Sequence, residues 1–197
     1  MEPILRKDFN NMLTTQDANA RYESFQHLIK ASNEKTDWAY EVWDELIANT
    51  QAPNNHLRTL AVQLLSNLAK SDVEQRLLTA IDKLVAVTRD EKFVTARQSL
   101  LSLWKVGIAY KPLQQIVTDK LEARYNECET EKNYTLIRFD IITVIKRIFD
   151  HVQDEGLKKQ SFAMINREAN EKYKIKYAAV WKDVLKGDKF RKAPKGK

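Results

Sequence analysis

One pattern occurs four times along the 197 residues: an arginine is followed by apolar or small residues three, four and seven positions later. The four copies are Arg21-Ser24-Phe25-Leu28, Arg58-Ala61-Val62-Leu65, Arg97-Leu100-Leu101-Trp104 and Arg138-Ile141-Ile142-Ile145. The arginines are 37, 39 and 41 residues apart. Such spacings place side chains on one face of an α-helix, and a period of about forty residues is typical of stacked helical hairpins. The repeat therefore indicates an array of helix pairs, an architecture that usually presents a binding surface.

The composition favours helix along almost the whole chain. Only four glycines and four prolines occur, whereas 43% of the residues are hydrophobic and 30% are charged. Glycine and proline are the residues that most disfavour helix interiors, so few interruptions are expected. We predict an all-α fold, a right-handed α-solenoid of about five stacked antiparallel helical hairpins.

Capping residues and breaks in the apolar pattern give the expected helix bounds. Asp17 has the side-chain oxygen of an N-cap, and Ser71 or Asp72 is expected to begin the third hairpin. The fifth hairpin lacks the arginine, although Lys174-Tyr177-Ala178-Trp181 repeats its spacing. The helix pairs are expected at 3–15 with 17–32, 36–50 with 55–70, 72–89 with 93–110, 112–128 with 134–151, and 154–169 with 171–186.

Residues 53–70 carry a resemblance to a known repeat family. The stretch PNNHLRTLAVQLLSNLAK resembles the second helix of a HEAT repeat, with a proline-containing turn, an early arginine, then Ala and Val before paired leucines. The resemblance extends over about residues 2–186 and is closest at 53–70, and armadillo-like three-helix units remain an alternative. It implies that the arginines form a hydrogen-bonded ladder between repeats and that the second helices line a concave face. The other reading of the arginines is direct contact with a ligand.

A polar stripe is expected on that concave face. Residues one, five and nine positions after each arginine point away from the apolar side of the helix. They are mostly amides and hydroxyls, with some aromatic and cationic side chains, which suits hydrogen bonding to a peptide, or to phosphates if the cations converge. An ordinary solvated face is the alternative. The expected partner-binding residues are Tyr22, Gln26, Lys30, Thr59, Gln63, Asn67, Gln98, Ser102, Phe139, Thr143 and Arg147.

The net charge of +6 is concentrated at one end of the chain. Residues 172–197 contain ten Lys or Arg and two Asp, whereas the other 171 residues contain 23 basic and 25 acidic side chains. We expect one domain over 1–186 and a flexible basic tail over 187–197. The tail either aids solubility or neutralises phosphates, an acidic partner or an anionic membrane surface. Possible phosphate contacts are Lys105, Lys146, Lys174, Lys176, Lys182, Lys189, Arg191 and Lys192.

No catalytic, cofactor-binding or metal-binding motif is recognised. The three histidines lie in different repeats, and Cys128 is the only cysteine, so the sequence allows neither an intrachain disulfide nor a cysteine cluster. Acidic neighbours at 127 and 129 disfavour the thiolate of Cys128. HEAT-like DNA glycosylases use Trp and Asp in a concave cleft, and Trp38, Tyr40 and Trp43 form an aromatic cluster here. The likeness is one of fold type alone, and packing between hairpins is the alternative.

The sequence thus predicts a non-enzymatic scaffold that binds a protein or peptide on the concave face. The alternative is a nucleic-acid-binding module that contacts backbone phosphates, and a HEAT-like DNA glycosylase is a third possibility. No apolar run reaches the roughly 20 residues that span a bilayer, and the N-terminal segment does not resemble a secretory signal. A cytoplasmic location is expected.

Overall fold

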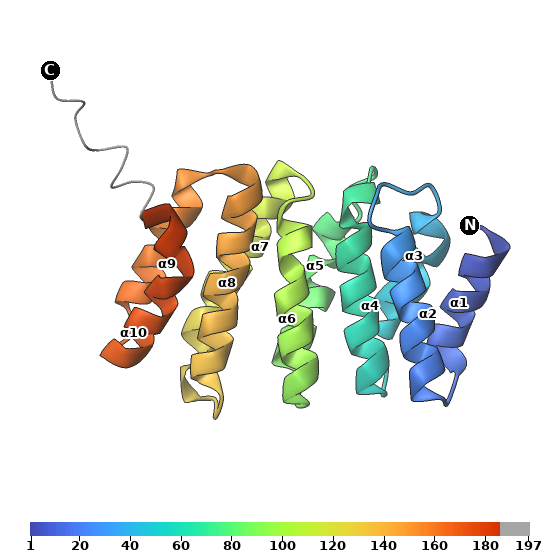
Figure 1. Ribbon diagram of the computed structural model, residues 1–197, viewed down its shortest axis with the longest axis horizontal. Coiled ribbons are helices and arrows are strands. Elements are labelled where there is room, and N and C mark those ends of the chain that lie inside the picture. Colours follow the sequence, from blue (N-terminus) through green and yellow to red (C-terminus); the bar gives the residue numbers. More distant parts are fainter. Residues whose placement is uncertain (186–197) are drawn as a thin grey trace, which may run out of the picture. The chain divides into compact units, whose positions relative to one another are not determined.

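The computed structural model describes residues 1–185, and within them the chain is helical with no β-strand (Figure 1). The predicted all-α class is confirmed. Short 3₁₀ turns follow several of the helices. The helices are α1 (Pro3–Thr14), α2 (Ala18–Ala31), α3 (Ala39–Asn49), α4 (Asn55–Leu68), α5 (Leu77–Ala86), α6 (Phe93–Gly107), α7 (Lys111–Glu127), α8 (Tyr134–Val152), α9 (Glu155–Asn166) and α10 (Glu171–Ala178).

The helices belong to two compact units, Met1–Val117 and Thr118–Lys197, with the boundary inside α7. The sequence led us to expect a single domain over 1–186. Residues 187–197, which we expected to form a tail, lie outside the described residues.

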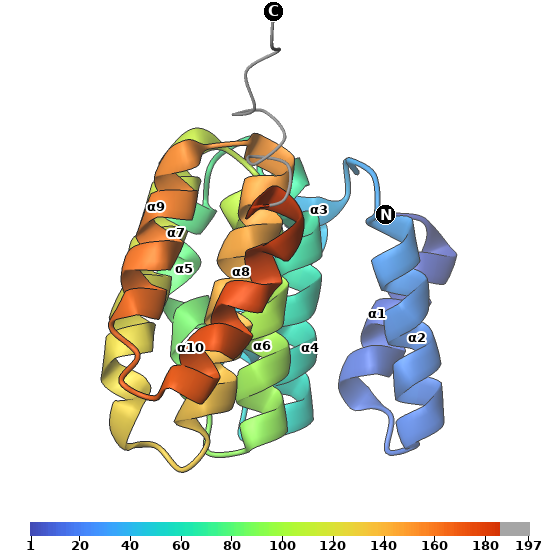
Figure 2. The ribbon, with the colours of Figure 1, turned by 60° about the vertical axis from the view of Figure 1, so that its left-hand side comes forward.

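The first unit contains three antiparallel hairpins, α1 with α2, α3 with α4, and α5 with α6. The second helices of these hairpins, α2, α4 and α6, lie next to one another (Figures 1 and 2). Leu28, Val62 and Leu65 are fully buried, as the repeated pattern predicts. Asp17 caps α2 by accepting hydrogen bonds from the amides of residues 19 and 20, which agrees with the sequence analysis.

The third hairpin departs from the pattern in two places. Its first helix begins at Leu77 and not near residue 72, because the buried Asp72 carboxylate accepts from the amides of Arg76 and Leu77 and caps the helix there. In α6, Leu103 is fully buried whereas Trp104 is only partly buried. The inward face of α6 is therefore rotated by one residue from the face that the arginine pattern predicts.

The second unit has α8 as its central helix, with α9 and α10 packed against it. Ile141, Ile142 and Ile145 are fully buried, as the pattern predicts. Trp181 is also fully buried, and its indole nitrogen donates to the Ser161 hydroxyl at 2.9 Å. The apolar residues of the divergent fifth hairpin therefore do supply core side chains.

Candidate partner-binding groove

Arg58 joins the second hairpin to the loop that precedes α6. Its guanidinium makes two hydrogen bonds to the Asp90 carboxylate, at 2.6 and 3.0 Å, and donates to the carbonyl oxygens of Ala52 and Pro53. The hydrogen bond with Asp90 raises the pKa of Arg58. Burial opposes ionisation of Asp90, but the hydrogen bonds from Arg58 and from the Lys92 amide, together with the charges of these two residues, outweigh burial and lower the pKa of that carboxyl. In this repeat the arginine has a structural role.

Arg138 has a similar role in the second unit. It is buried, donates to the Glu168 carboxylate at 2.8 Å and to the Tyr125 carbonyl oxygen at 3.2 Å, and lies over the Tyr125 ring. Arg97 lies over the Phe93 ring, with 5.7 Å between its guanidinium carbon and the ring centroid. Arg21 differs, because its terminal nitrogen donates to the Thr15 carbonyl oxygen and to no carboxylate within the described part of the chain.

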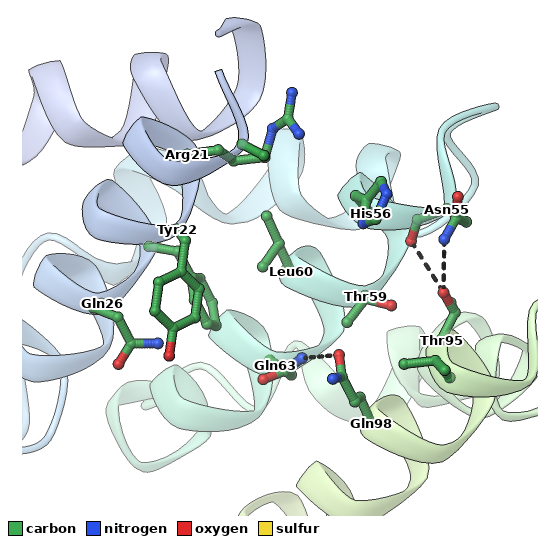
Figure 3. Close-up of a pocket in the computed structure, with 13 residues that line it drawn as sticks. Arg21, Tyr22, Gln26, Asn55, His56, Thr59, Leu60, Gln63, Thr95 and Gln98 are labelled. Atoms are coloured by element: carbon green, nitrogen blue, oxygen red, sulfur yellow. Dashed lines mark hydrogen bonds between the residues drawn. The ribbon is translucent and has the colours of Figure 1, made fainter. Parts of the chain in front are cut away.

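A pocket of about 600 Å³ lies over the first turns of α2, α4 and α6 (Figure 3). Its wall combines amide, hydroxyl, aromatic and aliphatic side chains with one arginine and one histidine. None of the lining residues is a carboxylate. They are Ala18, Arg21, Tyr22, Phe25, Gln26, Asn55, His56, Thr59, Leu60, Gln63, Val94, Thr95 and Gln98.

Three glutamines, one from each helix, lie along one side of this pocket. In the view of Figure 3, Gln26, Gln63 and Gln98 are below, whereas Arg21 and His56 are above. The Gln63 side-chain nitrogen donates to the Gln98 side-chain oxygen at 3.3 Å. We call Gln26, Gln63 and Gln98 the glutamine row. A primary amide offers both a donor and an acceptor, which is the pairing that a peptide main chain requires.

Thr59 lies between the glutamine row and the arginine side of the pocket. The residue is 5% exposed, and its hydroxyl oxygen is buried without a hydrogen-bond partner. A buried polar atom with no partner costs free energy, so a bound group that reaches this hydroxyl would recover it. Tyr22 and Val94 are 61% and 65% exposed, and they supply large apolar surface at the pocket.

Five of the predicted partner-binding residues come together at this pocket, and the others lie elsewhere. Asn67 is buried, and its amide donates to the Ile29 carbonyl oxygen and to the Ser32 hydroxyl, so it connects the first two hairpins. The Ser102 hydroxyl bonds the Ser66 hydroxyl at 3.1 Å. The five residues at the pocket are Tyr22, Gln26, Thr59, Gln63 and Gln98.

The remaining residues of the predicted stripe are Lys30, Phe139, Thr143 and Arg147. Lys30 is exposed on α2, outside the pocket lining. The other three lie on α8 in the second unit, where Arg147 is exposed and the Thr143 hydroxyl donates to the Phe139 carbonyl oxygen.

Two of the predicted phosphate contacts, Lys146 and Lys105, bind other residues of this chain. Lys146 is 7% exposed, and its ammonium lies 2.6 Å from Asp150 and 3.0 Å from Asp183. Burial disfavours the charged form, but the bonds to the two aspartates raise the pKa of Lys146. Lys105 donates to the Asn67 side-chain oxygen at 2.6 Å. These two cations therefore help to hold helices together.

The other predicted phosphate contacts belong to the C-terminal end. Lys174 forms an ion pair with Glu171 at 3.0 Å, Lys176 lies over the Phe139 ring, and Lys182 is exposed. Lys189, Arg191 and Lys192 lie outside the described residues.

The tryptophans of the aromatic cluster on α3 pack inside the first unit. Trp38 and Trp43 are buried, and the Tyr40 hydroxyl donates to Asp72 at 2.9 Å. Across residues 1–185, no group of three or more His, Cys, Asp or Glu is placed to hold a metal ion. The same stretch has no helix that is both long and apolar enough to cross a membrane.

The sequence analysis missed several lining residues. They lie on the same helix faces as the predicted stripe, about one turn closer to the N-terminus of each helix. His56 and Asn55 lie about one turn before Thr59, and Thr95 lies three residues before Gln98. Arg21 is one of the four repeated arginines, for which the sequence leaves both a contact between repeats and a contact with a ligand open.

Comparisons with known proteins give no family for this chain. No protein-family model matches, and no curated protein matches. Two engineered proteins solved by the Northeast Structural Genomics Consortium are 14% identical to the chain, each with a TM-score of 0.49. The alignments cover 84% of this chain and 80% of the first protein, and 94% of this chain and 90% of the second.

Proposed function

We propose that this chain is a non-enzymatic interaction module and that the pocket over α2, α4 and α6 binds an extended peptide segment of a partner protein. The observation that carries the proposal is the combination of amides from three neighbouring helices with a buried hydroxyl that has no partner. In this proposal the hairpins are HEAT-like repeats, and the bond from Arg58 to Asp90 supports that assignment. A cytoplasmic location belongs to the same proposal.

The dimensions of the three helices suit a short extended segment. Packed helices lie about 8–10 Å apart, so three of them span roughly 20 Å, which corresponds to about six residues of extended chain. The glutamine row then lies beside the peptide main chain, while Tyr22 and Val94 offer apolar contact to alternate side chains. The exposed aromatic surface is of the kind that dominates binding energy at protein interfaces.

The nucleic-acid alternative relies on convergent cations, and the described residues offer fewer of them than the sequence suggested. Lys146 and Lys105 are held by protein partners, and the pocket wall contains Arg21 and His56 as its only basic side chains. The glycosylase alternative is not favoured by the burial of Trp38 and Trp43.

The test uses an array of seven-residue peptides probed with the full-length protein. We expect a defined subset to bind, and we expect Gln63→Ala combined with Gln98→Ala to weaken the best solution-phase complex at least about tenfold, because two amides that contact the main chain are lost. Gln115→Ala on α7, outside the pocket, is the matched control and should bind normally. Circular dichroism checks that all variants fold. Equal binding by wild type and the double variant would contradict the proposal.

A further inference from the structure

Of the four repeated arginines, Arg21 has no acidic partner among residues 1–185. Arg58 is paired with Asp90 and Arg138 with Glu168, whereas Arg21 donates to the Thr15 carbonyl oxygen, and its Nε is buried without a hydrogen bond. The carboxylate of the neighbouring Asp17 is used to cap the first turn of α2. Within the described residues the charge of Arg21 is therefore not matched by an ion pair.

The surroundings of Arg21 favour a negative charge in the pocket. No aspartate or glutamate lines the wall, and His56 lies on the same side as Arg21 (Figure 3). The wall extends over the first three turns of α2 and α4 and the first two turns of α6, and the N-terminal end of each helix carries partial positive charge. The unpartnered Thr59 hydroxyl is an independent observation, because it supplies a buried donor next to this side of the pocket.

We propose that the pocket selects a peptide with an aspartate or glutamate side chain, whose carboxylate is bound by Arg21 and the Thr59 hydroxyl. This inference rests on the proposed peptide-binding function and specifies which peptide is bound. In this arrangement the main chain of the peptide follows the glutamine row, and its acidic side chain crosses the pocket toward the N-termini of the helices. Arg21 and Gln26 both come from α2 and lie on opposite sides of the pocket (Figure 3), and the peptides with amidated C-termini described below separate a side-chain carboxylate from a C-terminal one.

The experiment compares peptides that differ only at one central position. The array carries seven-residue peptides with Glu, Asp, Gln, Asn, Lys or phosphoserine at the centre, flanked by mixtures of uncharged amino acids, with free or amidated C-termini. Full-length wild type should prefer Glu or Asp over the matching amide by about tenfold, the effect of one charge-assisted hydrogen bond. The affinities of the best acidic peptide and of its matching amide peptide are then measured in solution by fluorescence anisotropy.

Variants of Arg21 separate a ligand contact from a structural role. Arg21→Gln should bring the acid-to-amide ratio close to one while the amide peptide still binds, and Arg21→Lys should keep part of the preference. Arg167→Gln, the same substitution at an exposed site in the second unit, should leave the ratio unchanged. Thermal melts of each variant show whether the lost contact with Thr15 alters the fold.

The possible failures can be told apart. If wild type binds no peptide, both the proposed function and this inference fail. If peptides bind without acidic preference, if the preference persists in Arg21→Gln, or if it requires a free C-terminus, only the inference fails. Stronger Arg21-dependent binding of phosphoserine peptides, or of single-stranded DNA added as a competitor, would assign the pocket to phosphate and overturn the carboxylate assignment.

Discussion

At the scale of single residues, the acceptor that each arginine meets determines its role. Arg58 and Arg138 occupy the same place in the repeat and each holds a carboxylate from the following hairpin, Asp90 and Glu168 respectively. Charge-assisted hydrogen bonds of this kind are stronger than neutral ones, and they fix the geometry of both partners. Arg21 meets no such carboxylate in the part of the chain that the structure describes, so the same residue at the same place in the repeat does not have the same role.

Removal of the Asp90 charge should destabilise the first unit. Asp90→Asn leaves Arg58 partly buried without its ion pair, and we expect the free energy of unfolding to fall by about 1–3 kcal/mol at neutral pH. Urea denaturation followed by circular dichroism measures the change. Glu74→Gln, which removes the charge of the exposed partner of Arg76, is the control and should change stability by less than about 1 kcal/mol.

The ion pair between Arg58 and Asp90 should make the free energy of unfolding depend on pH in the acidic range. The pKa of Asp90 is lower in the folded protein than its ordinary value of 3.8, so its contribution is fully present above that value and is lost as the pH falls through the folded pKa. Urea titrations at a series of pH values should show a steeper loss below about pH 4 in wild type than in Asp90→Asn. Equal slopes would show that the pair does not contribute.

The candidate site could be predicted in part at this scale. Helical spacing identified Gln26, Gln63 and Gln98 as exposed polar positions, and the structure places them at one pocket. Helical spacing did not identify the partners of Lys146 and Asn67, because these partners, Asp183 and Ser32, lie 37 and 35 residues away along the chain. A charged or amide side chain is predicted to face solvent from sequence alone, unless its hydrogen-bond partner is known.

At the scale of helices, the period and the composition were sufficient to predict an all-helical chain and the approximate bounds of its helices, but not the rotation of each helix. In α6, apolar residues occur at 100 and 103 and also at 101 and 104, so two neighbouring faces fit the pattern. The packing of α6 against α4 and α5 selects Leu100 and Leu103 for burial. The start of α5 was displaced for a different reason, because the Asp72 carboxylate caps the amides of residues 76 and 77.

Paired alanine substitutions test the rotation of α6. Leu103→Ala should lower the free energy of unfolding by about 2–5 kcal/mol, because it leaves a cavity in a fully buried site. Leu101→Ala, two residues earlier and only partly buried, should cost roughly half of that or less. Chemical denaturation gives both values, and a larger loss in Leu101→Ala would support the face that the arginine pattern predicts.

At the scale of the whole molecule, charge and the candidate groove are separated along the chain. The pocket lies between residues 18 and 98, whereas ten of the 33 basic side chains lie in residues 172–197. Phosphate contacts weaken steeply with salt, while apolar and amide contacts change less. The two kinds of binding can therefore be separated by ionic strength.

A salt series with two chain lengths measures that separation. A chain ending at Leu185 lacks six basic residues, and we expect it to bind the selected peptide with unchanged affinity. Any binding of single-stranded DNA should weaken steeply between 50 and 200 mM salt, values typical of such titrations, and should be reduced by the truncation. Salt-sensitive DNA binding that survives truncation would favour the nucleic-acid alternative.

The hydrogen bond between Gln63 and Gln98 competes with a peptide that binds the same two amides. A peptide that uses the same Gln63 N–H group or the same Gln98 lone pair must displace this contact, so part of the free energy that it gains from the two amides is offset by a bond that the protein alone already makes. Loss of either glutamine alone also removes that competition for the one that remains. The two single alanine variants should then each cost less than half of the loss in the double variant.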